Sequence, residues 1–327
     1  MQKMNPPKCD DLDYIHFLIA AQKVFTCTEA ARCQPEGQHS PAHDAFTRLL
    51  RRQPLDTEAL WQEAKAFVDP KRGLLDKPYA QQMELVTTHW SGKHQRVVRG
   101  IALLTLLWTD GQALIPCDFR VYDKPAGGQS KNEQFQAMLQ RAKQRGFAPE
   151  YVLMDSWYSG LENLKLIRGL GWLFLTRLKS NRVVNPDGAG NVPISRVEVP
   201  AQGRVVHLRG FGLVKVFRTV SRNGDAEYWA TNDLGMTATQ RAQLAGQGWG
   251  IEVYHRALKQ CCGVEKAQVR KAVAVMRHLP LALRAFLRLE VYRLRTGVSW
   301  YEAKLSLLRE AIRAFLAHPT YDLNPTA

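Results

Sequence analysis

The chain has 327 residues, 45% of them hydrophobic and eight of them Trp, which is enough apolar material for a sizeable core and excludes a disordered chain. Its formal net charge of +15 and its pI near 9.7 favour a polyanionic partner, and nucleic acid is the first candidate. The apolar run of residues 100–109 is far shorter than the roughly 20 residues of a membrane-spanning helix, so no membrane partner is expected.

The N-terminal residues 1–10 contain Lys3 and Lys8 but no apolar core and no small-residue cleavage site. We therefore expect no secretory signal and a cytoplasmic protein. The six Cys contain no CxxC motif, so reduced and mostly buried thiols are expected. A zinc site is not expected, because the spacing of four neighbouring residues does not match a zinc finger: Cys27, Cys33, His39 and His43.

Residues 1–68 carry apolar side chains at helical spacing, beginning with the run 14–19, and predict a small helical N-terminal domain. DNA binding is one hypothesis for this domain. Its basic stretch either contacts DNA phosphates or is an ordinary solvated helix face: Arg48, Arg51 and Arg52.

Residues 69–182 alternate between strand and helix patterns and predict the first part of an α/β core. After residue 97 the order is β-β-α-β-α-β. The expected elements are strands at 97–108 and 113–122, a helix at 130–145, a strand at 151–154, a helix at 161–168 and a strand at 172–178.

Residues 183–232 are rich in β-branched residues and turn signals and predict a β-rich insertion of antiparallel strands. Residues 233–318 return to a helical pattern, and residues 319–327 form a tail. Breaks between the helices are expected at Gly263, Pro280 and Gly297.

Two carboxylates occupy positions that favour a catalytic role. Asp155 follows the strand at 151–154, although a lone Asp at such a position is most often a helix cap. In the helix that begins near Trp249, Glu252 and Lys259 are seven residues apart, almost two whole turns, so they project in nearly the same direction. On an arbitrary helix such a pair is by default a solvated charged face.

Two blocks of the sequence, residues 152–158 and 249–259, resemble the DDE transposases of bacterial insertion sequences. The resemblance is to the group with a Tyr, Arg, Glu and Lys signature, and it extends from about residue 4 to about residue 318. It implies an α/β, RNase H-like mixed sheet with a β-rich insertion, a helical N-terminal domain and a helical C-terminal region. It also implies that Asp155 is the second catalytic aspartate, Glu252 the catalytic glutamate and Lys259 the signature lysine.

The chain departs from the family pattern at two places. The signature Arg and Tyr fall on Gly248 and Ala245, and Arg256 is a candidate to compensate. The family's first aspartate belongs to an Asp-Asp segment that is missing before Asp76, which leaves Asp76 as a tentative stand-in and Asp69 as a poorer one. We therefore expect a shortened first strand, local disorder around residues 69–80, and a transposase that binds DNA but is inactive or severely impaired. Alternatively, Asp76 replaces the lost acid.

Three carboxylates would hold Mg²⁺ or Mn²⁺, which prefer oxygen ligands and assist in-line phosphoryl displacement in two-metal sites. The metal ligands implied by the resemblance are Asp155, Glu252 and, tentatively, Asp76. The expected partners are double-stranded DNA, at transposon ends and target, and a second copy in a homodimer. Trp157 is a candidate DNA contact that would stack on a base, or else it is a core residue. Seven cationic side chains are candidate DNA contacts, or else they are solvated surface: Lys93, Arg96, Arg99, Arg177, Lys179, Arg182 and Arg256.

The resemblance implies a transposase that binds transposon ends and carries out Mg²⁺-dependent strand cleavage and transfer. The strongest rival is a catalytically dead remnant that still holds DNA, and a weaker one is a Mg²⁺-dependent nuclease on the same fold. Metal-dependent strand cleavage distinguishes an active transposase from the dead remnant. A strand-joining product distinguishes the transposase from the nuclease.

Overall fold

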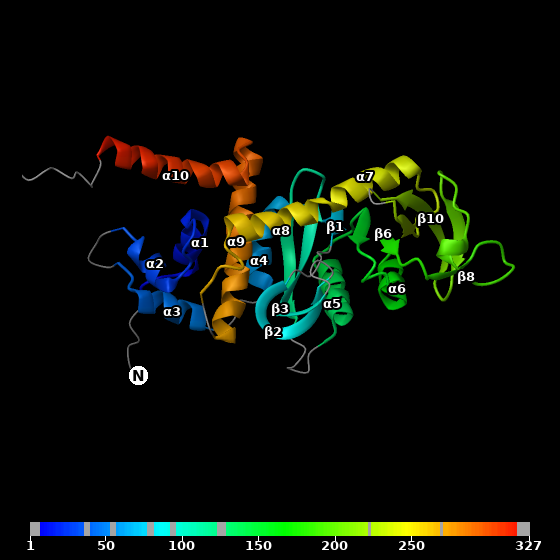
Figure 1. The fold of residues 1–327 in the computed structure, drawn as a ribbon, viewed down its shortest axis with the longest axis horizontal. Coiled ribbons are helices and arrows are strands. Elements are labelled where there is room, and N and C mark those ends of the chain that lie inside the picture. The colour runs from blue at the N-terminus through cyan, green and yellow to red at the C-terminus, as the bar shows by residue number, and fades with distance from the viewer. Residues whose placement is uncertain are drawn as a thin grey trace, which may run out of the picture. The chain divides into compact units, whose positions relative to one another are not determined.

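The computed structural model describes residues 7–35, 40–52, 57–76, 82–91, 96–122, 129–221, 224–268 and 271–318, with the backbone alone at 82–91 and 96–102. The chain forms two compact units (Figure 1). One comprises residues 57–255, and the other comprises residues 1–56 together with residues 256–327.

The unit of residues 57–255 is built on one mixed sheet, which joins eleven strands among the described residues. At its centre, β1 pairs antiparallel with β3 and parallel with β5, while β5 pairs parallel with β6 and β4 pairs antiparallel with β3. The resulting order β4-β3-β1-β5-β6 is that of an RNase H-like sheet, as predicted. These strands are β1 (Leu74–Asp76), β3 (Arg96–Thr109), β4 (Ile115–Tyr122), β5 (Tyr151–Met154) and β6 (Leu173–Leu178).

Strand β1 has only three residues, which confirms the predicted short first strand. Gly73 directly precedes it with φ +77, and a Cβ added there would lie 2.6 Å from the carbonyl oxygen of Thr109, so only glycine fits. Leu74 and Leu75 are 3% and 0% exposed. The expected disorder therefore does not extend to β1, because its side chains are buried in the sheet; residues 77–80 lie outside the described residues.

Helices cover both faces of this sheet (Figure 1). Two of them, α5 (Lys131–Gln144) and α6 (Leu161–Gly169), lie on one face, and α7 (Ala238–Gly248) lies on the other. Capping boxes begin α5 at Ser130 and α7 at Thr237. A buried apolar cluster joins residues of the sheet to the segment before α7: Leu74, Leu153, Leu175, Phe217 and Met236.

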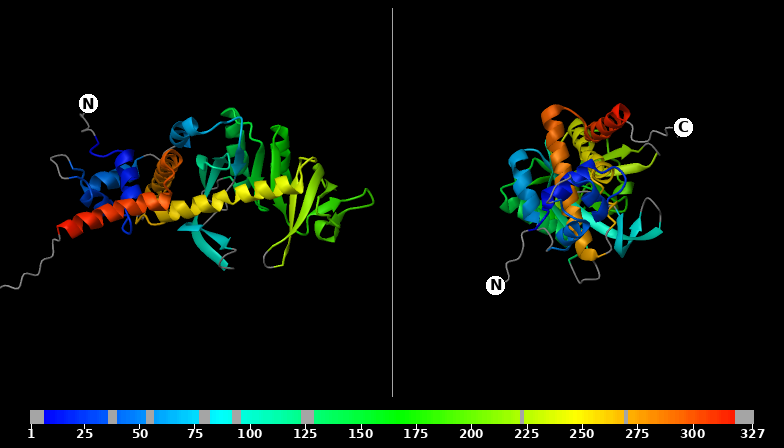
Figure 2. Two further views of the ribbon diagram at one scale, coloured as in Figure 1. Left: turned by 90° about the horizontal axis from the view of Figure 1, so that it is seen from above. Right: turned by 90° about the vertical axis from the view of Figure 1, so that its left-hand side faces the viewer.

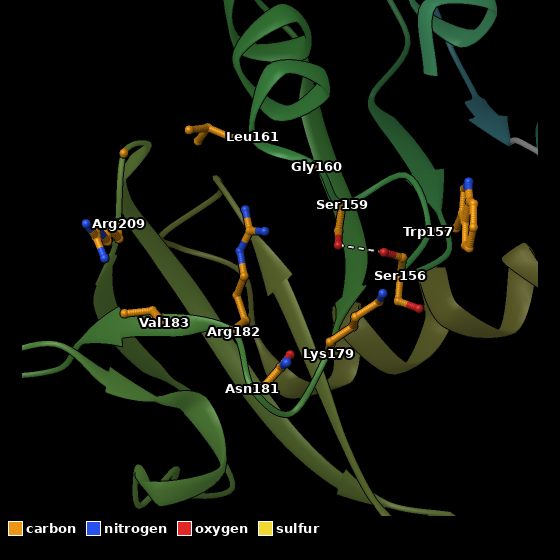
Figure 3. Close-up of a pocket in the computed structure, with 11 residues that line it drawn as sticks. Ser156, Trp157, Ser159, Gly160, Leu161, Lys179, Asn181, Arg182, Val183 and Arg209 are labelled. Carbon is orange, nitrogen blue, oxygen red and sulfur yellow. Dashed lines mark hydrogen bonds between the residues drawn. The ribbon is translucent and has the colours of Figure 1, made fainter. Parts of the chain in front are cut away.

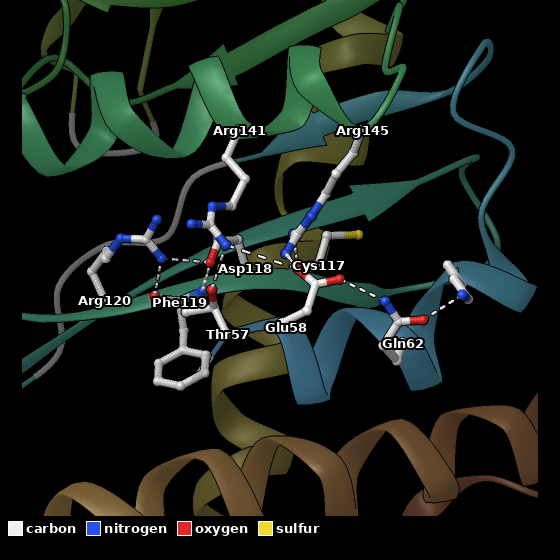
Figure 4. A network of polar contacts seen from close by, with 10 residues as sticks. Thr57, Glu58, Gln62, Cys117, Asp118, Phe119, Arg120, Arg141 and Arg145 are labelled. Atoms are coloured by element: carbon white, nitrogen blue, oxygen red, sulfur yellow. Dashed lines mark hydrogen bonds and ion pairs between the residues drawn. The ribbon is translucent and has the colours of Figure 1, made fainter. Parts of the chain in front are cut away.

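Helix α4 (Thr57–Ala64), followed by the short helix η1 (Lys65–Phe67), packs against β4 and belongs to this unit. Figure 4 shows the polar network that holds it. Glu58 of α4 pairs with Arg145 at 2.9 Å, and Arg145 also donates to the carbonyl of Cys117 at 2.9 Å. Asp118 pairs with Arg120 at 2.6 Å, and burial raises the pKa of Asp118. The boundary between the compact units thus precedes α4, which the sequence pattern alone groups with the N-terminal helices.

The predicted β-rich insertion extends the same sheet, because β11 pairs antiparallel with β6. The structure has a strand that the sequence pattern did not predict, β2 (Gln82–Ser91), which pairs with β3. A register shift between Met83 and Thr87 interrupts the alternating residue pattern by which a strand is recognised. The strands of the insertion are β7 (Val183–Asn185), β8 (Val192–Pro193), β9 (Arg204–Leu208), β10 (Gly212–Val220) and β11 (Ala226–Thr231), with η2 (Ile194–Arg196) between β8 and β9.

The other unit is helical. The Asp11 carboxylate in α1 accepts hydrogen bonds from Arg277 and Arg284 in α9, each at 2.8 Å. These bonds connect α1 to α9. Its helices are α1 (Asp11–Ala20), α2 (Cys27–Arg32), α3 (His43–Arg51), α9 (Ala272–Thr296), α10 (Trp300–Ala317) and the last part of α8 (Gly250–Cys261), which crosses the boundary between the units after His255.

The predicted helix breaks at Gly263 and Gly297 are confirmed, since both have positive φ beyond a helix end. The break predicted at Pro280 is wrong, because Pro280 lies inside α9. Proline removes one helical hydrogen bond, but the residues around Pro280 are buried, and their packing holds the helix together.

All six Cys are free thiols, four of them buried, as expected. No helix in the described parts of the chain combines the length and apolar character needed to cross a membrane.

Candidate active site

Asp76 ends β1, and Asp155 directly follows β5, the parallel strand beside it at the centre of the RNase H-like sheet. Asp76 is the last residue of β1 and pairs in register with Leu153 of β5. Asp155 stands two residues beyond Leu153, just past the end of β5. The register therefore brings these two residues to the same edge of the sheet, at the carboxyl ends of the parallel strands. Asp76 is 4% exposed, and Asp155 is half-buried.

Asp155 is held by the turn that follows it. Its Oδ1 accepts from the backbone N–H of Trp157 at 2.8 Å. The alternative role of a helix cap is wrong, because the N-cap of α6 is Gly160. The chain therefore turns sharply after β5 and leaves this carboxylate at the rim of the sheet.

Lys131, at the start of α5, adds a positive charge to this region. Burial lowers the pKa of Lys131, and the negative charge of Asp155 opposes that effect. The same carboxylate adds to burial in raising the pKa of Tyr158. Lys131 was missed by the sequence reasoning, because an N-terminal helix lysine alone gives no sign that its helix starts near a strand end.

Helix α7 ends directly over Asp76. A Cβ built on Gly248 would lie 3.8 Å from Oδ2 of Asp76 and 3.5 Å from Cδ1 of Leu153. Trp249 has helical backbone angles, and Glu252 N–H donates to its carbonyl at 3.0 Å, so α7 continues into α8 with little interruption (Figure 2). Glu252 follows Gly248 by four residues, about one helical turn, and its side chain is exposed.

The donor chemistry of this site fits a hard divalent cation only in part. Carboxylate oxygens suit Mg²⁺, which commonly takes one or two protein carboxylates together with substrate phosphates. Asp76 and Asp155 provide such a pair. Among the described residues, however, no three His, Cys, Asp or Glu side chains are grouped closely enough to hold a metal ion, and Glu252 is exposed.

The family is decided by a match over most of the chain: residues 81–287 match the family described as "Transposase DDE domain". The chain belongs to this family. The DDE-type transposase predicted from the sequence is thereby confirmed. Asp76 lies five positions before the matched segment.

One solved structure agrees with the fold. The piggyBac transposase synaptic complex with hairpin DNA is 10% identical, with a TM-score of 0.51, over 98% of this chain and 77% of that chain. The Drosophila P element transposase strand transfer complex is 9% identical over 98% of this chain and 88% of that chain, but its TM-score of 0.30 is too low to carry an argument. No curated protein matches the chain.

In this DDE transposase Lys259, which the resemblance assigns as the signature lysine, has an acidic partner. It forms an ion pair with Glu265, and both side chains are about one-third exposed. Arg256 is exposed on α8. At the positions that the resemblance assigns to the Tyr and Arg of the signature, Ala245 and Gly248 supply no phosphate-binding side chain.

The predicted DNA contacts differ in their surroundings. Arg177 is already engaged, since it pairs with Glu227 at 3.2 Å and lies 5.0 Å from the ring centre of Trp229. Lys179 and Arg182 line a pocket together with Trp157. A core role for Trp157 is wrong, because its side chain is 62% exposed. Lys93 lies outside the described residues, as do the side chains of Arg96 and Arg99.

Proposed function

We propose that this DDE transposase binds the ends of a bacterial insertion sequence in the cytoplasm, cuts there and joins the freed strand to target DNA. Asp76, Asp155 and Glu252 are its catalytic acids. The observation that supports the proposal is the register of β1 against β5, in which Asp76 pairs with Leu153, two residues before Asp155, while Gly248 at the end of α7 lies close to Asp76. It favours the alternative in which Asp76 replaces the missing first acid, over an inactive enzyme.

The chain's own residues fix the site. Asp76 is buried between strands β3 and β5, so its carboxylate has little freedom to move. Asp155 is restrained by the N–H of Trp157. Mg²⁺ or Mn²⁺ bound by these acids would stabilise the charge on the attacking and leaving oxygens of a phosphoryl transfer. Glu252 completes the set once DNA and metal are present.

A second candidate is a DNA-binding remnant that does not cleave. One observation favours it: the described residues contain no group of three metal ligands. The resemblance adds that Gly248, close to Asp76, stands at the position of the signature Arg. A nuclease on the same fold would cleave DNA without producing joined strands.

A homodimer is part of the proposal, and α10 supplies its surface. Five apolar side chains on α10 recur at alternating spacings of four and three residues, which is the pattern of a coiled-coil seam. Each is between 37% and 47% exposed: Tyr301, Leu305, Leu308, Ile312 and Phe315.

Metal-dependent strand cleavage of DNA that carries the sequences flanking the gene tests the catalytic proposal. We expect cleavage with Mn²⁺ by the natural chain, and none by Asp76→Asn, Asp155→Asn or Glu252→Gln. Asp69→Asn is the matched control, because Asp69 is exposed and caps a turn by accepting from Lys71 N–H at 3.0 Å. Cleavage that survives Asp76→Asn refutes the stand-in role, and tight DNA binding without any cleavage favours the remnant.

A further inference from the structure

The first residue of α5, Lys131, is a half-buried lysine near the turn that follows Asp155. Phe135 stands four residues further along α5 and therefore lies on the same face of the helix. Its ring packs against the ring of Tyr158, with the ring centres 5.2 Å apart. Tyr158 is the third residue after Asp155, so the face of α5 that carries Lys131 packs on this turn.

Hydrogen bonds fix the start of α5 against the same turn. The side-chain nitrogen of Asn163, in α6, donates to Oδ1 of Asn132 at 2.8 Å and to the carbonyl of Tyr158 at 3.0 Å. Asn163 is 1% exposed, so water does not compete for these bonds. The turn is closed by the hydroxyl of Ser159, which donates to the carbonyl of Ser156 at 2.8 Å (Figure 3). The N-terminal end of α5 is therefore held in one position beside the turn.

The fold gives the ammonium of Lys131 no acidic partner. It lies 5.2 Å from the ring centre of Tyr122, and within the described ranges of the chain it forms no ion pair with Asp155 or with any other acid. Burial lowers the pKa of Lys131, and the negative charge of Asp155 opposes this effect. A cation in the first turn of a helix is also unfavourable, because that end of the helix dipole is positive. A charge kept against these local preferences indicates a ligand-binding role.

We propose that Lys131 contacts a phosphate of the cut DNA strand next to the cleaved bond and holds that phosphate beside Asp155. The inference rests on the proposed function, because it takes Asp155 as one of the catalytic acids. The strand that reaches these acids brings a row of phosphates with it, and an ammonium binds a phosphate as a point charge. The flexible stem of a lysine lets its ammonium leave the Tyr122 ring and reach the phosphate when DNA binds.

Single-turnover cleavage with Mn²⁺, on DNA that carries the sequences flanking the gene, measures what this contact contributes. Lys131→Met keeps the length of the side chain and removes its charge. We expect this variant to cleave about 100-fold more slowly than the natural chain, as when one group that stabilises developing charge is removed. Lys131→Arg restores the charge and should cleave within about tenfold of the natural rate.

Lys143→Met is the matched control. Lys143 lies in the last turn of the same helix, about 18 Å along the helix axis from Lys131. Its ammonium also lies near an aromatic ring, 5.8 Å from the ring centre of Trp172. This variant should cleave at the natural rate.

DNA with a single uncharged methylphosphonate linkage identifies the phosphate that Lys131 contacts. One linkage at a time is replaced along the same DNA, and anisotropy without metal measures the affinity. At one linkage the natural chain should bind about tenfold more weakly than it binds unmodified DNA, because one charged contact is lost. Lys131→Met should lose less than about twofold at that linkage, since it no longer makes the contact.

The outcomes separate this role from the proposed function. Cleavage by Lys131→Met at the natural rate, or an equal loss of affinity in both proteins at every methylphosphonate linkage, overturns the role of Lys131 and leaves the proposed transposase function standing. If the natural chain binds DNA without cleaving it, the proposed function fails. The methylphosphonate comparison then decides the role of Lys131, because unequal losses support the role and equal losses overturn it. Absence of DNA binding overturns both.

Discussion

At His278, in the helical unit, burial fixes both the tautomer and the charge of a side chain. The ring is fully buried, and its Nδ1 lies 3.2 Å from the hydroxyl of Tyr14 while Nε2 lies 3.2 Å from the carbonyl of Gly263. A neutral ring satisfies both contacts if Nε2–H donates to Gly263 and Nδ1 accepts from Tyr14. Burial lowers the pKa of His278 to about 4, and the Gly263 and Val264 backbone contacts only partly oppose this.

The lowered pKa predicts that acid destabilises the protein. Between pH 6.5 and 4 the unfolded chain takes up a proton at His278 that the folded chain refuses, so stability is full above pH 6.5 and falls as the pH drops. At about pH 5 the loss is about 2 kcal/mol. Urea unfolding of the natural chain and of His278→Gln measures it. The variant should be less stable at neutral pH but lose less on acidification, and an equal loss in both proteins would contradict the assignment.

At the scale of elements, the active site depends on how closely the end of α7 approaches β1 and β5. A Cβ added to Gly248 would meet Leu153 and Asp76 at ordinary contact distance, whereas a Cβ added to Gly246 would meet nothing within 4 Å. Both glycines lie in the same helix, so a substitution at either position changes the helix propensity. Only a substitution at Gly248 also changes the packing of the helix on the sheet.

Gly248→Leu should therefore push the helix away from the acids, while Gly246→Leu should not. We expect the first substitution to cost about 1–3 kcal/mol of stability, as overpacking does, and to lower strand cleavage. The second places its side chain in open space and should retain both properties. Thermal unfolding and cleavage assays on the pair check this, and equal effects would show that α7 does not lie over Asp76.

The elements that sequence could predict are those with a local signal. Capping and an apolar face predict α5, and an uninterrupted apolar run predicts β5 and hence the position of Asp155. The continuation of α9 through Pro280 depends on tertiary packing, which local punctuation does not encode. The sequence offered Asp76 only as a tentative stand-in, because the pairing of its three-residue strand β1 with β5 is a long-range contact that local patterns do not encode.

At the scale of the whole molecule, the net charge of +15 predicts DNA binding that weakens strongly with salt. Replacing counterions at about six phosphates would reduce affinity roughly 10³-fold between about 50 and 200 mM salt. Lys179→Gln should lower the salt slope by about one, since this side chain has no carboxylate partner. Arg177→Gln should change it less, because Arg177 is paired with Glu227. Salt titrations of both variants by anisotropy measure these slopes, and a salt-independent affinity would refute the electrostatic account.

The exposed seam on α10 predicts a dimer that one charge disrupts. Ile312→Glu places a carboxylate in the seam and should shift the chain toward monomer in analytical ultracentrifugation. Leu307→Glu is the control, because Leu307 is 41% exposed but stands outside the four-three spacing of the seam. A monomeric natural chain, or equal effects of the two substitutions, would count against α10 as the interface.

The central claim is that Asp76 serves as the first of three catalytic acids in a chain whose family match begins only at residue 81. Anomalous diffraction from crystals of the DNA complex soaked in Mn²⁺ tests it most directly, because it locates the metal against each carboxylate. We predict Mn²⁺ bound by both Asp76 and Asp155, within about 2.5 Å of their oxygens, with Glu252 turned toward the same site. Mn²⁺ on Asp155 without Asp76, or no bound metal beside DNA, would contradict the account.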